Sequence, residues 1–211
     1  MPRLRQVTRA EASSEALQAY DRLFGDRDPV AEPGTATGTP GNWWTVFALV
    51  PDVLVHAQSG FGLFNSRKRI LPPYFRELGL TRAGFAAGSQ FVFSQHSKAS
   101  RAAGIPEEKL AAIPAWGVAE VFDARERAVL AYTDELVLQD GRVQDATFAA
   151  LQAHFSDEAI LELTYAVATY RMHATICRAL RLEYDDIDER VVEIPAPGEA
   201  AAADVMSQIS R

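Results

Sequence analysis

The amino-acid sequence predicts an all-α fold, and three observations lead to this prediction. Apolar residues recur every three or four positions through most of the chain, for example in residues 13–24 and 156–183. Prolines and capping residues stand where these periodic segments begin, as expected for helix starts. The period-two alternation of a half-buried strand does not occur over any useful length. We therefore expect helices packed around one long, apolar, central helix.

The first half of the chain divides into helices at its serines, prolines and glycines. Residues 13–24 place apolar side chains at helical spacing behind serines that can cap the first turn. Residues 25–42 are rich in Gly, Pro and Thr and predict a long surface loop. Pro51 and the pair Pro72–Pro73 suit the first turns of two further helices, because a first turn leaves its N–H groups unbonded. Gly88 predicts a break before the next helix.

The second half continues the helical pattern. A proline and two glutamates open a helix over residues 104–113, where acidic side chains suit the positive end of the helix dipole. Asp123 is a suitable N-cap for a helix that stops at Gly141, and a short helix follows over residues 143–155. Residues 156–183 begin at a Ser-Asp cap and run for about seven turns with an almost continuous apolar surface. This segment is the expected central helix.

Length and composition favour one domain with a tail. The chain has 211 residues, of which 48% are apolar, enough to build one sizeable buried core. We expect a single helical domain over residues 1–184, interrupted by the long loop at 25–42. Residues 185–211 are rich in Pro, Ala and Gly and predict a C-terminal tail.

Charge and cysteine content exclude several classes of function. The net charge is −7 with acidic and basic residues interspersed, so neither nucleic acid nor an anionic membrane is an expected partner. The single cysteine, Cys177, excludes an intrachain disulfide and a cysteine-built zinc site. No run approaches the ~20 apolar residues of a membrane-spanning helix, and the N-terminus lacks the apolar core of a signal peptide. We expect a cytoplasmic, soluble protein.

The stretch GSQFVFSQHSKASRAAG, which begins at Gly88, carries the first candidate for chemistry. Ser89, Phe93 and His96 recur at steps of three and four, so they share one face of a helix. Glu77 lies on the preceding helix, which the break at Gly88 can fold back against this one. A carboxylate beside an imidazole is a general acid–base arrangement, because the anion fixes the tautomer of the ring. A half-buried structural histidine is the alternative interpretation.

The run YFRELGLTRAGFAAGSQFVFSQHSKASRAAGIPEEKL resembles the core of the carboxymuconolactone decarboxylase and alkylhydroperoxidase-D-like (AhpD-like) family. In the peroxidase branch this core carries a Glu, two cysteines three residues apart, and a His. Glu77 and His96 match the Glu and the His, whereas Ser89 and Val92 stand at the cysteine positions. The spacings agree, with twelve residues from Glu77 to Ser89 and seven from Ser89 to His96. The resemblance extends over about residues 41–184 and implies an AhpD-like helical domain.

The missing cysteines bear on the reaction. Hydroperoxide reduction by the peroxidase branch needs a thiolate nucleophile and a resolving thiol, and neither Ser89 nor Val92 supplies one. Cys177 lies in a strongly apolar segment and is expected to be an inert core cysteine. Thiol peroxidase chemistry at this position is therefore excluded.

The resemblance then implies the decarboxylase branch, whose members act on small lactones and related cyclic acids without a cofactor or a metal. Decarboxylation leaves an enolate whose charge must be stabilised and whose carbon must be protonated. His96 would donate the proton or hydrogen-bond the enolate, and Glu77 would orient His96. Isomerisation, dehydration and lactone opening need the same two groups, so the reaction type stays open.

Seven further residues are candidates for substrate binding, because they are aromatic, hydroxyl-bearing or basic and stand in or near the motif or the later helices. They are Ser89, Phe93, Trp43, Trp44, Tyr170, His173 and Arg76. For each of them a position in the core or on a solvated helix face is the alternative. We predict no metal site, since His56 and His154 have no spacing partner, although Glu77, His96 and His173 could together supply ligands.

Two other functions fit the same residues. One is a non-catalytic ligand-binding or structural member of the fold, in which Glu77 and His96 serve as helix-to-helix hydrogen bonds. The other is an alkylhydroperoxidase-like oxidoreductase that uses a different route. The resemblance also implies a homo-oligomer, whether a dimer, a trimer or a hexamer.

Overall fold

The computed structural model describes residues 1–64, 66–187 and 190–197. Within these ranges the regular structure is helical and contains no strand, which confirms the predicted all-α class. Most of the predicted tail, residues 198–211, lies outside the described residues.

The chain forms two compact units. The first comprises residues 1–67, 176–189 and 194–211, and the second comprises residues 68–175 and 190–193. The expected single domain over residues 1–184 stays a prediction.

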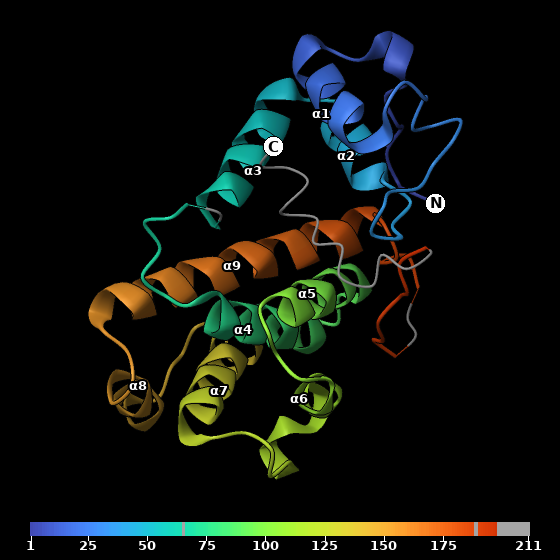
Figure 1. Cartoon of the computed structure of the whole chain (residues 1–211). Helices are drawn as coiled ribbons and strands as arrows, with labels where there is room; N and C mark the ends of the chain where they lie inside the picture. The colour runs from blue at the N-terminus through green and yellow to red at the C-terminus, as the bar shows by residue number, and fades with distance from the viewer. Residues whose placement is uncertain (65, 188–189, 198–211) are drawn as a thin grey trace. The chain divides into compact units, whose positions relative to one another are not determined.

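The first unit contains the N-terminal helices (Figure 1). They are the 3-10 turn η1 (Arg9–Glu11), α1 (Ser14–Phe24), α2 (Asn42–Phe47) and α3 (Pro51–Phe64). Helices α1, α2 and α3 pack on one another and bury Tyr20 and Leu54 completely. Helix α1 begins after the cap Ser13, and α3 begins at Pro51, where the sequence predicts these helices to start.

Residues 25–41 form the irregular segment between α1 and α2. Its end is fixed by Glu183, whose carboxylate accepts the backbone N–H groups of Gly41 and Trp43 at 2.9 and 2.7 Å. These groups are unbonded donors at the start of α2, so Glu183 acts as a cap supplied from a distant part of the chain. Burial raises the pKa of the Glu183 carboxyl to about 7, although its hydrogen bonds to the backbone oppose the shift.

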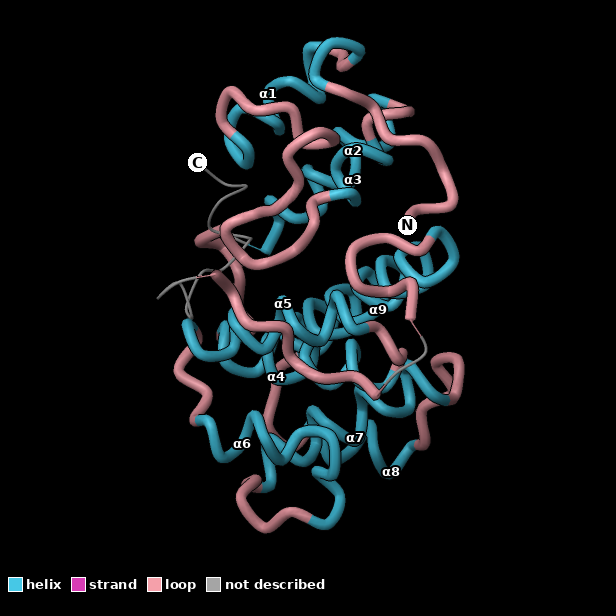
Figure 2. Tube along the Cα trace, turned by 90° about the vertical axis from the view of Figure 1, so that its right-hand side faces the viewer, coloured by secondary structure: helices cyan, strands magenta, loops and turns pink. Residues whose placement is uncertain are grey.

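The second unit contains the remaining helices. They are α4 (Pro73–Ala86), α5 (Gln90–Ala102), α6 (Glu107–Ala112), the 3-10 segment η2 (Ile113–Val118), α7 (Ala124–Leu138), α8 (Asp145–Gln152) and most of α9 (Asp157–Leu180). Helix α4 packs against both α5 and α7, and the views of Figures 1 and 2 place α4 and α5 side by side. This α4–α5 pair carries the candidate site.

Helix α9 is buried on one face only. Leu163 and Val167 are buried, whereas Leu161, Tyr165 and Met172 are 68%, 52% and 47% exposed. The predicted continuous apolar surface is therefore divided between a buried face and an exposed row. The role of α9 as the central helix stays a prediction.

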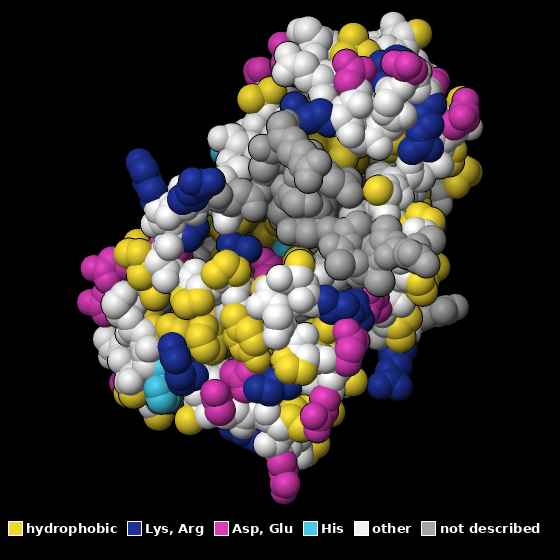
Figure 3. Space-filling view, in the orientation of Figure 1, with side chains coloured by type: hydrophobic (Ala, Val, Ile, Leu, Met, Phe, Trp, Pro, Cys, Tyr) yellow, Lys and Arg dark blue, Asp and Glu magenta, His cyan; other side chains and the backbone are white. Residues whose placement is uncertain are grey.

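The surface carries both signs of charge. On the face shown in Figure 3, acidic and basic side chains lie interspersed, in keeping with their order in the sequence. No described helix combines the length and the apolarity that crossing a bilayer requires.

Candidate active site

The turn between α4 and α5 folds the two helices back on each other. Gly88 adopts a φ of +65°, in the left-handed region that glycine favours. Ser89 then starts α5, because its Oγ accepts the N–H of Val92 at 3.1 Å. The chain therefore reverses at the break that Gly88 predicts, and places α5 against α4.

Gly84 lets α4 and α5 approach closely. A Cβ added at Gly84 would lie 2.5 Å from the backbone nitrogen of Phe93 and 2.8 Å from its Cα. Since both atoms belong to the backbone of α5, no side chain fits at this position without moving the helix. Further along the pair, the hydroxyl groups of Thr81 and Ser100 lie 2.9 Å apart and join the same two helices.

Glu77 and His96 meet across this helix pair. His96 Nδ1 lies 2.8 Å from Glu77 Oε2, and Arg76 Nε donates to Glu77 Oε1 at 2.8 Å. Glu77 and His96 are each only 3% exposed. An ionised carboxylate can only accept, so Nδ1 of His96 carries the proton. In the neutral ring this leaves Nε2 as the basic nitrogen.

The environment of Glu77 keeps it ionised. Burial raises the pKa of its carboxyl, but the hydrogen bonds and charges of His96 and Arg76 together outweigh burial and hold that pKa below its ordinary value. Glu77 is therefore an anion at neutral pH. A fixed anion beside Nδ1 stabilises the imidazolium that forms when Nε2 takes up a proton.

The second ring nitrogen of His96, Nε2, is not used in the contact with Glu77. Within the described part of the chain, no side chain or backbone group hydrogen-bonds Nε2. The ring contacts the ring of Tyr170 from α9 in a T-shaped arrangement, with centroids 4.1 Å apart and an interplanar angle of 86°. A basic nitrogen beside an aromatic wall can accept a small ring and exchange a proton with it.

His173 is the neighbour of Tyr170 on α9. Its ring centroid lies 5.8 Å from that of Tyr170, and the residue is 3% exposed. Burial, assisted by the charge of His96, lowers the pKa of His173 to about 4. His173 is therefore neutral at physiological pH and offers a hydrogen bond rather than a positive charge.

The other predicted substrate-binding residues take different positions. The hydroxyl of Ser89 caps α5, and Phe93 lines a separate cavity on that helix. Trp43 and Trp44 lie in α2 of the first unit, where Trp43 stacks on Phe47 with centroids 3.8 Å apart. Their roles toward a substrate stay predictions.

Cys177 is fully buried, and burial raises its pKa well above the ordinary value of a thiol. The thiol is therefore protonated at neutral pH and is shielded from solvent. This burial agrees with the core position that its apolar neighbours predict.

The structure assigns no metal-ligand set. Among the described residues, no three side chains of His, Cys, Asp or Glu gather in a geometry that can hold a metal ion.

Sequence reasoning did not foresee how much polar surface α5 buries. Residues 92–100 are all buried, and they include Ser94, Gln95 and Lys98. Lys98 is 1% exposed, and both polar atoms of the Gln95 amide have no hydrogen-bond partner within the described residues. Serine, glutamine and lysine are also the usual residues of a solvated helix face, so their presence alone could not reveal this burial.

Comparison with known proteins points to the same helix pair. Residues 57–135, which include Glu77 and His96, match the model of the Carboxymuconolactone decarboxylase family. The chain is therefore similar to this family over residues 57–135. The match confirms the family that the spacing from Glu77 to His96 indicates.

Three relatives extend the carboxymuconolactone decarboxylase comparison. YnjA of Escherichia coli (strain K12) is 25% identical over 143 residues, which cover 67% of this chain and 76% of YnjA. A peroxidase-related protein with an AhpD core from Ralstonia eutropha JMP134 is 16% identical with a TM-score of 0.64, covering 91% of this chain and 100% of its own. The debrominase Bmp8, as a variant in complex with 2,3,4-tribromopyrrole, is 16% identical with a TM-score of 0.64, covering 99% and 100% of the two chains. The two structures show that the AhpD-like helical fold is shared.

Proposed function

We propose that this protein is a cofactor-free acid–base enzyme, a decarboxylase-like lyase or an isomerase, that acts on a small cyclic substrate bearing a carboxylate or a lactone. One observation carries the proposal. Glu77 and His96 form a buried pair in which His96 Nδ1 contacts the carboxylate and Nε2 has no hydrogen-bond partner among the described residues, at a position where the chain has no thiol.

Each of the two reactions uses a different protonation state of His96. In isomerisation, neutral His96 takes a proton from carbon at Nε2 and returns it to another carbon, while Glu77 stabilises the imidazolium in between. In decarboxylation, the imidazolium form gives its Nε2 proton to the enolate carbon that the loss of carbon dioxide leaves. Arg76 keeps Glu77 ionised in both cases.

Tyr170 and the size of the bound molecule in a relative support a ring-shaped substrate. The aromatic ring of Tyr170 provides an apolar surface beside His96, and His173 adds a neutral hydrogen-bonding group on the same helix. The shared fold of Bmp8 holds 2,3,4-tribromopyrrole, a small flat ring. Tyr170, His173 and Arg76 are thus the proposed substrate-binding residues nearest to the acid–base pair.

Replacement of His96 tests the proposal. In a screen of small lactones and cyclic keto acids, we expect His96→Gln to reduce turnover by at least about 10²-fold. Glutamine has no basic nitrogen that could take the place of Nε2 in transferring a proton to or from the substrate. The melting temperature should change by only a few degrees, since Gln keeps a polar side chain there. His56→Gln, an exposed histidine on α3, is the matched control and should keep full activity. Full activity in His96→Gln would refute the proposal.

A non-catalytic ligand-binding or structural member is the second candidate, and one observation favours it. The Glu77–His96 hydrogen bond joins α4 to α5, so the pair also contributes to packing. For this candidate we expect His96→Gln and Glu77→Gln to lower the melting temperature strongly, while no cyclic acid is turned over by the wild type.

The third candidate is an alkylhydroperoxidase-like oxidoreductase that works without the cysteine pair of the peroxidase branch. The peroxidase-related relative supports this candidate. Thiol-dependent peroxidase assays on the wild type and on Cys177→Ala separate it from the others. Under our proposal neither protein shows such activity.

We also infer a homo-oligomer. The exposed row on α9 consists of Leu161, Tyr165, Ala168 and Met172, at steps of four, three and four residues. This spacing is that of a helix seam covered by a second helix. A second copy of this chain carries an identical row, so the two rows could pack on each other in a symmetric dimer contact.

A further inference from the structure

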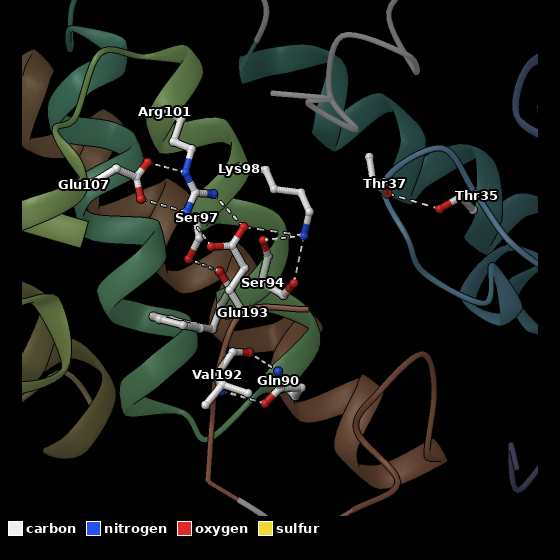
Figure 4. Close-up of polar contacts among 11 residues, drawn as sticks. Thr35, Thr37, Gln90, Ser94, Ser97, Lys98, Arg101, Glu107, Val192 and Glu193 are labelled. Carbon is white, nitrogen blue, oxygen red and sulfur yellow. Dashed lines mark hydrogen bonds and ion pairs between the residues drawn. The ribbon is translucent and has the colours of Figure 1, made fainter. Parts of the chain in front are cut away.

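A short segment of the C-terminal tail is tied to α5 by polar contacts (Figure 4). Residues 190–193, here called the strap, belong to the second unit together with α5. The side-chain amide of Gln90 accepts the N–H of Val192 at 2.9 Å and donates to the carbonyl of the same residue. Val192 is 50% exposed, so its side chain buries little apolar surface and its backbone is held by these polar contacts.

The last residue of the strap, Glu193, is bound by cations of α5. Arg101 donates from Nη1 and Nη2 to the two carboxylate oxygens, each at 2.6 Å, and Lys98 Nζ lies 3.8 Å from Oε1 (Figure 4). Arginine commonly binds free carboxylates through a bidentate contact of this kind. Glu193 therefore occupies a carboxylate-binding position built by α5.

Lys98 is held in place on the inner side of this position. It is 1% exposed, and its Nζ donates to Ser94 Oγ at 3.0 Å and to the Ser94 carbonyl at 3.3 Å. Burial lowers the pKa of the Lys98 ammonium, and the charge of Glu193 opposes this shift. A buried cation is destabilised when its anion leaves, so the position favours a carboxylate.

A cavity of about 300 Å³ opens beside the Glu193 carboxylate. Its apolar walls are Phe93, Leu110, Ala111 and Pro114, from α5, α6 and η2. Arg190 also lines the cavity, is exposed, and pairs with no carboxylate in the described part of the chain. Glu107 accepts from Nε and Nη2 of Arg101, so an incoming carboxylate would compete with Glu193 for the edge formed by Nη1 and Nη2.

We propose that Arg101, Lys98 and this cavity form a binding site for a small organic carboxylate, and that Glu193 fills the carboxylate position in this structure. The ligand displaces Glu193 from Arg101, and its apolar body enters the cavity. One carboxylate replaces another, so the local charge balance is unchanged. Val192 is half exposed, so opening the strap uncovers little of this side chain.

This site is separate from the acid–base pair. Gln90, Ser94, Ser97 and Arg101 recur at steps of four, three and four along α5, so they form one row that faces the strap. His96 lies outside this row and points to Glu77 on α4. The inference therefore does not depend on the proposed reaction.

Titration of the full-length protein with benzoate, with benzamide as the uncharged probe, tests the site by calorimetry. The wild type binds benzoate against internal competition from Glu193. If the strap is closed nine-tenths of the time, its release tightens binding by about tenfold. We expect this gain in Glu193→Gln, and also in Gln90→Ala, which frees the strap without changing any charge.

Variants of Arg101 test whether the tighter binding of benzoate occurs at this site. Adding Arg101→Gln to Glu193→Gln should abolish the tighter binding of benzoate. If that double variant does not fold, Arg101→Lys replaces Arg101→Gln, because lysine keeps the positive charge but cannot make the bidentate contact. Benzamide should bind all variants equally weakly. The proposal is overturned if neither Glu193→Gln nor Gln90→Ala binds benzoate more tightly than the wild type, or if the gain survives without Arg101.

Discussion

Two buried glutamates show how neighbouring groups set the charge of a carboxyl. Glu77 is buried beside Arg76 and His96, whose hydrogen bonds and charges keep its pKa below the ordinary value despite burial. Glu183 is also buried, but it accepts hydrogen bonds from backbone N–H groups and a hydroxyl and lies near the like charge of Asp185, so burial, assisted by that charge, raises its pKa to about 7. A cation within hydrogen-bonding distance thus decides between the two outcomes. Glu77 can serve as the permanent anion of an acid–base pair, whereas Glu183 titrates near neutrality.

The raised pKa of Glu183 predicts a loss of stability with rising pH. The folded state holds the proton more tightly than the unfolded chain, so the stabilisation is complete below about pH 4.5 and is lost as the pH rises through about 7. The full difference corresponds to about 3 kcal/mol, of which about 1 kcal/mol falls between pH 6 and 8. Urea denaturation at these two pH values should show this loss in the wild type and not in Glu183→Gln. Equal pH dependence in the two proteins would rule out Glu183 as its source.

At the scale of elements, the α4–α5 pair depends on a contact between backbones. Ser89 and Gly88 determine where α5 begins, and Gly84 allows the helix to lie against α4. The distance between Glu77 on α4 and His96 on α5 follows from this packing. A residue with no side chain therefore positions the two groups proposed to perform the chemistry.

Gly84→Ala should separate these helices. Its Cβ meets the backbone of Phe93 at 2.5 Å, so we expect a loss of about 1–3 kcal/mol in the free energy of unfolding, as in other overpacked interiors. Gly60→Ala in α3 is the matched control, because no atom lies within 4 Å of its Cβ. There the substitution should be neutral or stabilising by about 0.5–1 kcal/mol. Urea denaturation of both variants measures the difference, and similar effects at the two glycines would contradict the role of Gly84.

At the scale of the whole molecule, the sequence predicted the helix starts and the contact between Glu77 and His96, while other long-range contacts escaped prediction. Pro51, Pro73 and Asp123 mark helix starts because their chemistry acts on neighbouring residues. The spacing from Glu77 to His96 predicted a pair that the α4–α5 turn brings to 2.8 Å.

The contacts that escaped prediction join parts of the chain far apart in sequence. Glu183 caps α2 from more than a hundred residues away, and Glu193 binds Arg101 across 92 positions. Nothing in the local pattern distinguishes Gly84 from Gly60, or the buried Lys98 from a surface lysine. These differences arise only when the helices pack.

The exposed row on α9 predicts how the chain assembles. If a second copy covers this row, Tyr165→Glu places a charge in the contact and should shift the protein toward the monomer, as measured by light scattering after size-exclusion chromatography. Val118→Glu, at an 87% exposed position in η2, introduces the same charge elsewhere and should leave the mass unchanged. A monomeric wild type, or equal masses for the wild type and Tyr165→Glu, would refute assembly through α9.

The position of the proton on His96 tests the central claim most directly, because it needs no substrate. Nitrogen NMR of protein labelled at histidine distinguishes a protonated from an unprotonated ring nitrogen, and the spectrum of His96→Gln identifies the signals of His96. In the ring that carries a single proton, we expect this proton on Nδ1, facing Glu77, and an unprotonated Nε2. Glu77→Gln should weaken this preference. A proton found on Nε2 of the wild-type ring would contradict the proposed acid–base pair.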